Sequence, residues 1–482
     1  LKGMAWGTGL TLLAAALPAW QAGNSKPLTL QQRAVTDQKW QAHLPLLAGV
    51  GLAVLVAGYL LLLPAKGSLV GAFVALNLII FGFCLMVPLF MHGVLHLVLK
   101  LTQGFIPQTF RLALRNIQTG ISRTGLAVAA LTVAVSVTVG VGIMVGSFRQ
   151  TVILWLEQTL VGDLQVNSFD NTGIPPDLYN TLRDLPETRS LGLAYMLRAE
   201  SNVGEVRVTT STGAISDSLF MKEAVPDYEL AVDAGAGLLV SEPFAYIHEL
   251  QLGDELELIT AQGSLRQPIS GIFYDYSTGP GLVAMTQSLF AQQWPQHPAS
   301  RIVINLVDPA TASPAASRMR QLLASYGGGY GVAANADIRQ LTLNIFDRTF
   351  AITHVLRLLA IVVAFVGVLS ALLALQLERM REYAILRASG MTVKEIALMI
   401  GVQTLLMGLL AGLLALPLGL MMSDILIDVI NRRSFGWSML HTLQPGVFRE
   451  ALLLALAAAL LAGVYPALRV AAVRPAQALR QE

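Results

Sequence analysis

Long stretches without a charged residue limit the fold of this chain more than any other feature of its sequence. Of the 482 residues, 54% are hydrophobic and only 13% are charged, whereas soluble domains carry roughly 25% charged residues. A helix of about 20 apolar residues crosses a hydrocarbon core about 30 Å thick. Seven apolar segments approach or exceed that length, near 1–18, 44–65, 67–91 and 123–148, and between Arg357 and Glu378, Glu395 and Asp424, and Glu450 and Arg469. We therefore predict a polytopic α-helical membrane protein.

The first apolar segment starts at Leu1 with no initiator methionine, no basic region ahead of it and no cleavage-site pattern. A signal peptide would show these features, so we do not interpret the segment as one. We expect the chain to begin inside a helix whose upstream part belongs to the full-length protein.

Charge distribution predicts the orientation. Basic residues predominate in four connecting stretches, 18–43, 100–123, 378–395 and 466–482, and alternation of the helices places all four on one side. The long segment 149–348, in which acidic residues outnumber basic ones, lies on the other side. The positive-inside rule makes the basic side cytoplasmic. Three arginines on the second outer loop oppose this assignment but are outnumbered: Arg432, Arg433 and Arg449.

Residues 149–348 are predicted to form one large α+β extracytoplasmic domain. "GDLQVNSF" and "RIVINLVD" alternate apolar and polar residues as half-buried strands do, and "PATASPAASRMRQLLASYGGG" is typical of an amphipathic helix that ends at glycines. A β-rich insert is predicted at about 231–298, with a strand, a helix, a Gly-Asp turn and two strands joined near Gln262 and Gly263. "YDYSTGPGLV" indicates a mobile loop, for which an ordinary surface loop is favoured over a ligand clamp.

Candidate catalytic and metal-binding residues are few. The motifs G-x-S-x-G and H-E-x-x-H do not occur, so no catalytic residue is assigned. His92 and His96 have the i,i+4 spacing of a metal site, but no acid or cysteine lies nearby in the sequence, and histidines bonded to neighbouring helices are the preferred interpretation. Cys84, the single cysteine, is interpreted as a packing residue in an apolar helix, and the outer domain is expected to fold without disulfides.

Two acids lie in an apolar segment. Asp424 and Asp428 share a helical face and could mark an ion pathway, but their position near the outer boundary favours solvated charges at a helix end. His354 and Arg357, at the outer end of another span, are possible partners for them.

The stretch 105–122 contains "PQTFRLALRNIQTGISR", which predicts an amphipathic helix on the cytoplasmic side. Its apolar face carries Phe110, Ala113, Leu114, Ile117 and Ile121. Its polar face carries Arg111, Arg115 and Gln118. We expect this helix to lie in the membrane interface with its cations toward lipid headgroups, as a brace at the membrane surface.

The stretch "LERMREYAILRASGMTVKEIALM" predicts a stiff helical corner at 378–395. A charged helix continues out of the membrane, Gly390 ends it, and Thr392 with Glu395 forms a capping box that starts the next span. Such a corner could transmit force from a protein docked on it. A solvated turn between two spans is the alternative interpretation.

Three separated motifs resemble the FtsX-like permease family, which includes the MacB-type and LolC/LolE-type (type VII) ABC transporter permeases. "REYAILRASGMTVKEI" is similar to the cytoplasmic corner of that family, "FRLALRNIQTGISRTGLAVAALTVAVSV" to its surface helix and first span, and "YPALRVAAVRPAQALR" to its C-terminal end. The resemblance covers about 105–482, including a final part, 350–482, with three spans, the corner and a basic tail. It implies that the large domain is periplasmic and that the membrane is the bacterial cytoplasmic (inner) membrane.

A loose repeat extends the resemblance to the start of the chain. Pro18, Ala19, Lys26 and Pro27 have the spacing of Pro466, Ala467, Arg474 and Pro475. Some family members contain two four-helix units joined by two extra spans. By this resemblance 1–33 is the last span and tail of a truncated first unit, and 44–98 is the linking pair in a ten-span form.

The resemblance also implies the function. In the 482 residues no lysine follows a glycine, so no P-loop is present, and ATP and Mg²⁺ are expected on separate ABC ATPase subunits, two in number. ATP hydrolysis there would change the shape of the periplasmic domain (mechanotransmission) and move lipids, lipoproteins or other hydrophobic molecules, with a periplasmic protein as a possible partner and no role for nucleic acid. The expected coupling residues are Glu378, Arg379, Arg381, Glu382, Ile385, Leu386, Arg387, Gly390, Met391 and Thr392. A secondary transporter and a membrane-anchored sensor are the alternatives.

Overall fold

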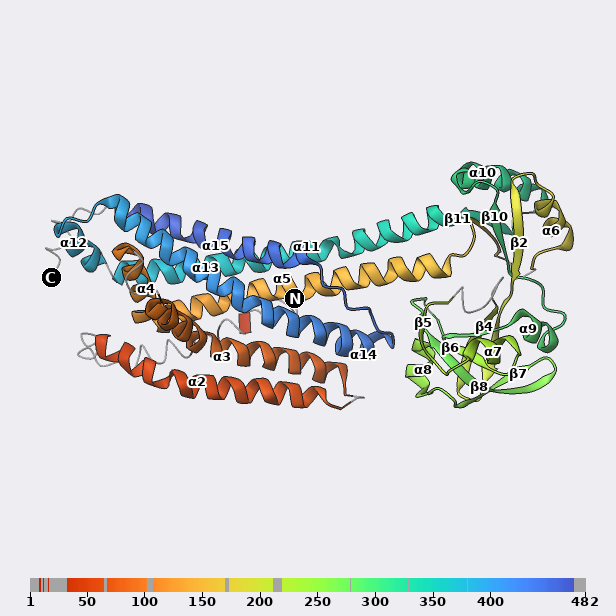
Figure 1. Cartoon of the computed structure of the whole chain (residues 1–482), viewed down its shortest axis with the longest axis horizontal. Coiled ribbons are helices and arrows are strands. Elements are labelled where there is room, and N and C mark those ends of the chain that lie inside the picture. The colour runs from red at the N-terminus through yellow and green to blue at the C-terminus, as the bar shows by residue number, and fades with distance from the viewer. Residues whose placement is uncertain are drawn as a thin grey trace.

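The computed structural model describes residues 8–9, 12, 16, 33–64, 67–101, 107–169, 173–210, 219–277, 279–327, 329–378 and 380–471. The molecule is elongated: a bundle of long helices forms one part, and two β-containing lobes lie beyond one end of it (Figure 1). The smaller lobe is called the sheet lobe below, and the larger one the barrel lobe.

Six of the described helices are long and apolar enough to cross a membrane. Their apolar parts are His43–Leu62, Leu69–Leu101, Thr124–Thr159, Asn335–Gly367, Val393–Phe435 and Pro445–Val464. Together with the extramembrane lobes they confirm the predicted fold class, a polytopic helical membrane protein with one large α+β domain. The seventh predicted segment, 1–18, lies outside the described residues except at positions 8, 9, 12 and 16.

The bundle is built from α2 (Arg33–Leu62), α3 (Leu69–Leu101), α5 (Ile121–Thr159), α11 (Asn335–Glu378), α13 (Val393–Asp424) and α15 (Pro445–Ala471). Small residues let the helices approach closely. A Cβ atom on Gly408 of α13 would lie 2.5 Å from that of Ala459 on α15, and one on Gly419 would lie 2.5 Å from Val139 Cβ on α5. Helix α13 therefore packs closely against α5 on one side and α15 on the other.

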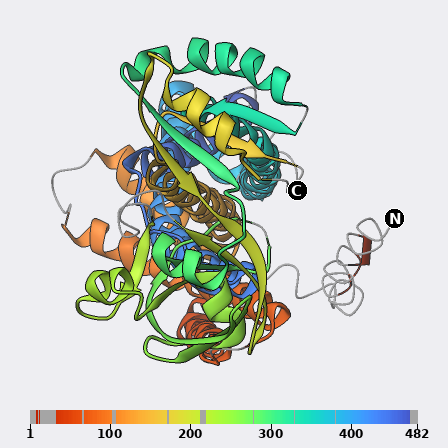
Figure 2. The same cartoon turned by 90° about the vertical axis from the view of Figure 1, so that its right-hand side faces the viewer.

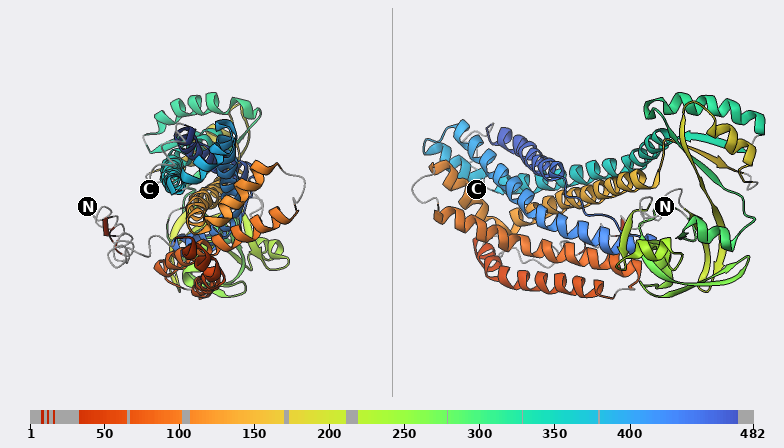
Figure 3. Two further views of the ribbon diagram at one scale, coloured as in Figure 1. Left: turned by 90° about the vertical axis from the view of Figure 1, so that its left-hand side faces the viewer. Right: turned by 45° about the vertical axis from the view of Figure 1, so that its right-hand side comes forward.

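Two helices are much longer than the membrane is thick. Helix α5 has 39 residues and α11 has 44, so at 1.5 Å per residue they extend about 58 and 66 Å, against about 30 Å of hydrocarbon. The extra length forms a two-helix stalk toward the sheet lobe (Figure 3). Phe148 of α5 contacts Phe346 and Phe350 of α11, with ring centroids 5.1 and 5.8 Å away.

The domain boundaries predicted at 149 and 348 fall within these helices. Arg149, which ends one apolar run, pairs across the stalk with Asp347, its Nε lying 3.0 Å from Asp347 Oδ1. Beyond this pair, Val152 and Leu156 are buried with Phe346. Packing between the two helices thus continues past the end of the apolar run.

The sheet lobe has four antiparallel strands in the order β11-β1-β10-β2. They are β1 (Leu164–Ser168), β2 (Thr188–Ala194), β10 (Arg301–Leu306) and β11 (Tyr330–Ala334). The two strands predicted from alternation are β1 and β10, and they pair with each other. The lobe is completed by helices α6 (Pro176–Arg183) and α10 (Ala312–Leu323) and by the 3₁₀ turns η3 (Pro309–Thr311) and η4 (Ala324–Tyr326). The predicted amphipathic helix is α10.

The barrel lobe contains a seven-stranded sheet in the order β5-β8-β6-β9-β4-β3-β7, in which β7 also pairs with β8 and closes the sheet. Its strands are β3 (Met196–Ser201), β4 (Gly204–Thr210), β5 (Met221–Ala224), β6 (Leu238–Ser241), β7 (Glu255–Thr260), β8 (Gly263–Phe273) and β9 (Leu282–Met285). Helices α7 (Tyr228–Asp233), α8 (Glu242–His248) and α9 (Gln287–Gln293) accompany them. The predicted strand, helix and hairpin are β6, α8 and β7–β8. The sheet begins at Met196, ahead of the predicted insert at 231, because the β3–β4 hairpin joins it.

Helix α12 (Met380–Ala388) and helix α4 (Gln108–Thr119) lie at the end of the bundle opposite the lobes. The π-helical turn η5 (Ile425–Asn431) and helix α14 (Arg432–Phe435) lie at the end near the barrel lobe (Figure 1). The end-on view shows both lobes side by side over the bundle (Figure 2). The corner and the large domain are therefore on opposite sides of the bundle.

Candidate functional site

The corner between α12 and α13 is held by backbone hydrogen bonds that require a glycine. Gly390 has φ +103°, in the region that side-chain-bearing residues rarely adopt. This conformation lets the amide of Met391 donate to the carbonyl of Leu386 at 3.0 Å and that of Gly390 donate to Arg387 at 3.2 Å. These bonds satisfy carbonyls that a helix end leaves free. The predicted helix stop at Gly390 is confirmed.

The predicted capping box at the start of α13 is also confirmed. The amide of Glu395 donates to Thr392 Oγ1 at 3.3 Å, and the amide of Thr392 donates to Glu395 Oε2 at 2.7 Å. Both ends of the corner are thus fixed by local bonds, and only a few residues separate the two helices.

A small apolar core lies behind the corner. Tyr383, Ile396, Met399 and Ile400 are buried there together with Ala113 of α4. Sequence reasoning did not single out Tyr383, which is 2% exposed. Its position three residues before Leu386, on the same face of α12, is the signal that could have identified it. This core joins the corner to α4.

The predicted coupling residues are divided between this core and the surface. Leu386 and Met391 pack against the core, whereas Ile385 is 52% exposed. Glu382, Gly390 and Thr392 are exposed and Arg387 is half-buried. Arg379 lies outside the described residues, and the side chains of Glu378 and Arg381 are not described. The exposed face can receive another protein, and its role as a docking site stays a prediction.

The apolar face of α4 packs on protein. Leu114 and Ile117 are fully buried and belong to the core of the bundle, and Phe110 is half-buried beside them. The helix contacts α13 and α3. An amphipathic pattern does not distinguish lipid from protein as the partner of the apolar face, so the sequence could not indicate this packing. Contact of the polar face with headgroups stays a prediction.

Basic side chains gather where α4 meets α3. Lys100, Arg111 and Arg115 line a hollow of about 430 Å³, together with His96, Leu99 and Gln118. Among the residues that the structure describes, no acid lines it. An arrangement of this kind near the membrane surface suits an anionic headgroup, since each basic residue there contributes about 1 kcal/mol of attraction.

A double variant, Arg111→Gln with Arg115→Gln, tests this prediction. In nonionic detergent, added phosphatidylglycerol is expected to stabilise the wild-type chain more than phosphatidylcholine does, because a ligand that binds the folded state raises the melting temperature. The double variant should lose most of that difference. The control replaces two exposed arginines of the lobes, Arg183 and Arg266, with glutamine. An undiminished preference for phosphatidylglycerol in the double variant would contradict a headgroup site.

At the other end of the bundle, the barrel lobe is bound to the loop after α14 through one buried acid. Glu242, the first residue of α8, is only 2% exposed. Its carboxylate accepts hydrogen bonds from Lys222 Nζ (2.7 Å), from the amide of Ser438 (2.9 Å) and from Ser438 Oγ (2.7 Å). Sequence reasoning did not identify this contact, because it joins residues almost 200 positions apart.

Aromatic rings surround the same loop. Trp437 stacks on Phe148 of the stalk at 5.1 Å and meets Tyr276 of the barrel lobe edge-on at 4.9 Å. The Tyr276 hydroxyl donates to the carbonyl of Ser438 at 2.9 Å. Burial raises the pKa of Tyr276, and the negative charge of Glu242 adds to this, so the phenol stays protonated and able to donate. Stalk, loop and barrel lobe therefore meet at Trp437.

Two of the three arginines that oppose the positive-inside assignment, Arg432 and Arg433, have structural partners. Arg433 donates to the carbonyls of Leu62 (3.0 Å) and Pro64 (2.7 Å), and thereby caps the end of α2. Arg432 lies over the ring of Tyr246 in the barrel lobe, 5.2 Å from its centroid. Both cations are thus retained on this side by specific contacts.

The acids near this end of the bundle are exposed. His441 Nε2 lies 2.8 Å from Asp428 Oδ1, and its Nδ1 lies 3.8 Å from Asp424 Oδ1. The acid side chains are 62% exposed for Asp424 and 56% for Asp428, as expected for charges at a helix end. The structure assigns them His441 as a partner. The side chains of His354 and Arg357, the partners considered from the sequence, are not described.

The remaining candidates lie on α3: Cys84 and His92 are half-buried, and His96 is exposed. Cys84 packs against the bundle core. The rings of His92 and His96 stack with centroids 6.5 Å apart. In the described part of the chain, no group of three or more His, Cys, Asp or Glu side chains could hold a metal ion.

One protein family and one curated relative match the sequence of this chain. The family described as FtsX-like permease C-terminal matches residues 355–475. An uncharacterized ABC transporter permease protein of Mycobacterium tuberculosis is 33% identical over 503 residues, an alignment that covers 100% of this chain and 58% of the relative. The chain thus spans little more than half the length of that relative.

Two solved structures are also similar to part of the chain. One is the periplasmic region of MacB from Actinobacillus actinomycetemcomitans, with 14% identity, 39% of this chain and 96% of that chain covered, and a TM-score of 0.29. The other is the extracellular domain of the noncanonic ABC-type transporter YknZ from Gram-positive bacteria, with 9% identity, 36% and 100% covered, and a TM-score of 0.27.

Proposed function

Residues 355–475 form an FtsX-like permease domain in a chain that is homologous to an ABC transporter permease, and from this we propose that the chain is the permease subunit of an ABC transporter. Separate ATPase subunits, two per complex, bind ATP and Mg²⁺ and dock on the corner at 378–395. The basic end of the bundle faces the cytoplasm of a bacterial cell, and the lobes lie on the periplasmic side of its inner membrane.

One observation carries this proposal. Helix α11 begins at Asn335, directly after strand β11 of the sheet lobe, and runs without interruption to Glu378, next to the corner helix α12. A single rod of 44 residues therefore links the docking end to the domain on the other side. A helix transmits displacement along its axis because each turn is bonded to the next.

A second rod starts from the same corner. Helix α13 leaves Thr392 and leads through η5 and α14 to the loop at Ser438, which is bonded to the barrel lobe. The corner thus connects to the sheet lobe through α11 and to the barrel lobe through α13. We propose that ATP-driven motion of the corner shifts α11 relative to α13 and so changes the position of the sheet lobe relative to the barrel lobe.

The transported molecules are proposed to be lipids, lipoproteins or other hydrophobic compounds, handled at the outer leaflet or in the periplasm, where a further protein can receive them. This substrate class is consistent with lobes that stand on a stalk above the membrane rather than around a pore. The direction of movement proposed is export or extraction.

Complex formation with an ABC ATPase, such as one encoded beside this chain, tests the proposal. The full chain is expected to co-purify with the ATPase and to stimulate ATP hydrolysis in lipid nanodiscs. Arg381→Glu combined with Glu382→Arg should reduce that stimulation at least about tenfold, because two reversed charges at a docking face cost several kcal/mol. The control reverses the exposed Glu257–Arg266 pair of the barrel lobe. A chain that binds no ATPase, or a corner variant with wild-type stimulation, contradicts the assignment.

A further inference from the structure

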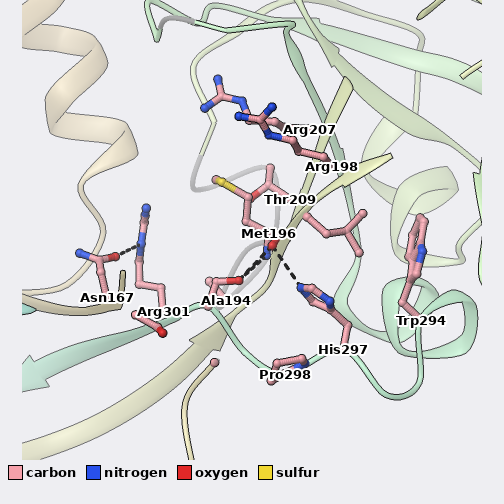
Figure 4. A pocket seen from close by; sticks show the side chains of 14 residues that line it. Asn167, Ala194, Met196, Arg198, Arg207, Thr209, Trp294, His297, Pro298 and Arg301 are labelled. Atoms are coloured by element: carbon pink, nitrogen blue, oxygen red, sulfur yellow. Dashed lines mark hydrogen bonds between the residues drawn. The ribbon is translucent and has the colours of Figure 1, made fainter. Parts of the chain in front are cut away.

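A cleft between the two lobes has the features of a ligand site. Two cavities of about 730 and 410 Å³ adjoin here, because Met196, Arg207, Thr209 and Arg301 line both of them. Figure 4 shows the larger one, with Arg301 on the side of the sheet lobe and Arg207 on strand β4 of the barrel lobe. The volumes fall in the range of small-molecule sites, about 300–1,000 Å³.

Neither arginine forms a direct ion pair with a described acid, although the charge of Asp275 acts on Arg207 across Ser277. Arg301 Nε donates to Asn167 Oδ1 at 2.8 Å, and Arg207 Nη2 donates to Ser277 Oγ at 2.9 Å. Arg207 Nε is buried without a hydrogen-bond partner. Among the residues that the structure describes, neither guanidinium forms an ion pair with an acid. Burial lowers the pKa of Arg301, as it does for a cation removed from water.

One acid lines the cleft, and it is already bonded. Asp275 is 2% exposed, and its carboxylate accepts from the amide of Ser277 at 2.9 Å and from Ser277 Oγ at 2.8 Å. Burial raises the pKa of Asp275, while the bonds from Ser277 and the charge of Arg207 lower it. A third arginine, Arg198, lines the larger cavity and pairs with the exposed Glu205 outside the lining. The cleft therefore carries an excess of positive charge.

The lining of the smaller cavity is largely apolar. In the smaller cavity, side chains from the stalk and from both lobes face the space, among them Trp155, Leu160, Phe273, Leu282 and Ile338. A wholly polar anion would leave these walls in contact with water or with its own hydration shell. An amphiphile suits both the basic and the apolar surface of the cleft, because its charged end pairs with the arginines while its chain covers the apolar wall.

The loop that follows β8 forms one wall. A Cβ atom on Gly279 would lie 3.0 Å from Arg207 Nη2, so this glycine lets the backbone approach the guanidinium. Gly281 has φ +99°, and a Cβ atom on it would lie 2.6 Å from Phe244 Cβ. This is the loop for which an ordinary surface role was favoured from the sequence. Tyr274, Asp275 and Ser277 of this loop line the cleft.

We propose that this cleft binds an anionic amphiphile, with its carboxylate or phosphate on Arg207 and Arg301 and its hydrocarbon chain along the apolar wall. The inference rests on the proposed function only for the role of such a molecule as the substrate. The two arginines come from different lobes, so a molecule that fills the cleft contacts both lobes. Any relative motion of the lobes then changes the affinity of the cleft.

Photo-crosslinking tests the site directly. The probe is a palmitic acid that carries a diazirine on its chain, added to the full chain in nonionic detergent without ATPase or nucleotide. We expect mass spectrometry to find the label in peptides from 196–210 and 273–285. Unlabelled palmitate should displace the probe. Hexadecanol, which lacks the charge, and inorganic phosphate, which lacks the chain, should not displace it at the same concentration.

Variants of the arginines sharpen the test. Arg207→Gln and Arg301→Gln are each expected to weaken palmitate binding about tenfold, the loss of one charge-assisted interaction. Arg207→Lys retains the charge and should lose only a few-fold, which separates recognition of the anion from a folding defect. The control is Arg266→Gln, an exposed arginine paired with Glu257 on the same lobe.

The outcomes are distinct. Equal displacement by hexadecanol, or unchanged binding in both glutamine variants, overturns the anion site. Displacement by phosphate as effective as that by palmitate overturns the amphiphile and leaves a free-anion site. A chain that binds no palmitate but stimulates its ATPase contradicts the amphiphile site in the cleft and leaves the proposed function intact. A chain that binds palmitate but stimulates no ATPase overturns the proposed function and not the cleft.

Discussion

Replacing Glu242 with alanine is expected to release the barrel lobe from the loop that follows α14. The substitution leaves Lys222 without its acid and removes the acceptor of the Ser438 amide and hydroxyl. Removal of one partner from a buried charge pair costs about 3–5 kcal/mol, because the other charge stays buried and unpaired. The hydrogen bonds of Glu242 form the polar centre of the junction between the barrel lobe and the loop after α14. Their loss therefore costs more free energy than the loss of any single aromatic contact around them.

Amide hydrogen exchange at Ser438 measures this effect. The amide donates to Glu242 in the intact protein, and exchange requires the bond to open. An opening equilibrium shifted by about 3 kcal/mol corresponds to an exchange rate raised about 100-fold. Glu242→Gln, which keeps an acceptor for Ser438, should show a smaller increase. Glu255→Ala, at an exposed position on β7 of the same lobe, is the control. Wild-type protection in Glu242→Ala would show that the lobe is held by other contacts.

Gly390→Val is expected to abolish coupling while leaving the bundle folded. A β-branched residue at φ +103° is strongly disfavoured, so the substitution forces the end of α12 into another conformation. The bonds from Gly390 and Met391 to α12 are then lost, and the corner no longer has a fixed shape. A force applied to α12 would bend the corner instead of moving α11 and α13.

The measurement is ATPase stimulation in nanodiscs, for which we expect at least a tenfold decrease. Gly401→Val is a matched control, since this glycine lies in α13 close to the corner, has an ordinary helical conformation, and its Cβ would have no atom within 4 Å. The circular dichroism of both variants should equal that of the wild type. Stimulation that survives in Gly390→Val would mean that a rigid corner is not required.

Features that depend on neighbouring residues were predictable from the sequence. The charge-free runs located all six described spans, because the cost of burying a charge in hydrocarbon excludes charges from these helices whatever their neighbours are. The stop at Gly390 and the capping box at Thr392 and Glu395 involve residues at most four or five positions apart. Such local bonds leave a signature in the order of residue types.

Features that depend on distant partners were not predictable. Nothing next to Arg149 in the sequence indicates that α5 continues to Thr159, because the stalk is stabilised by Phe346 and Asp347 of another helix. The apolar face of α4 was assigned to lipid, and the structure fills it with α3 and α13. The pairing of Glu242 with Ser438 also joins segments whose distance in the sequence gives no hint of contact.

The sequence by itself determined which helices are apolar enough to span a membrane and how the corner is shaped, since both follow from the transfer free energies and backbone preferences of nearby residues. Only the tertiary structure decided that the two rods from the corner reach different lobes, and that Arg207 and Arg301 face one cleft between those lobes. Burial, pairing and the shape of a cavity depend on which distant segments pack together, and a cooperative fold fixes that packing for the whole chain at once.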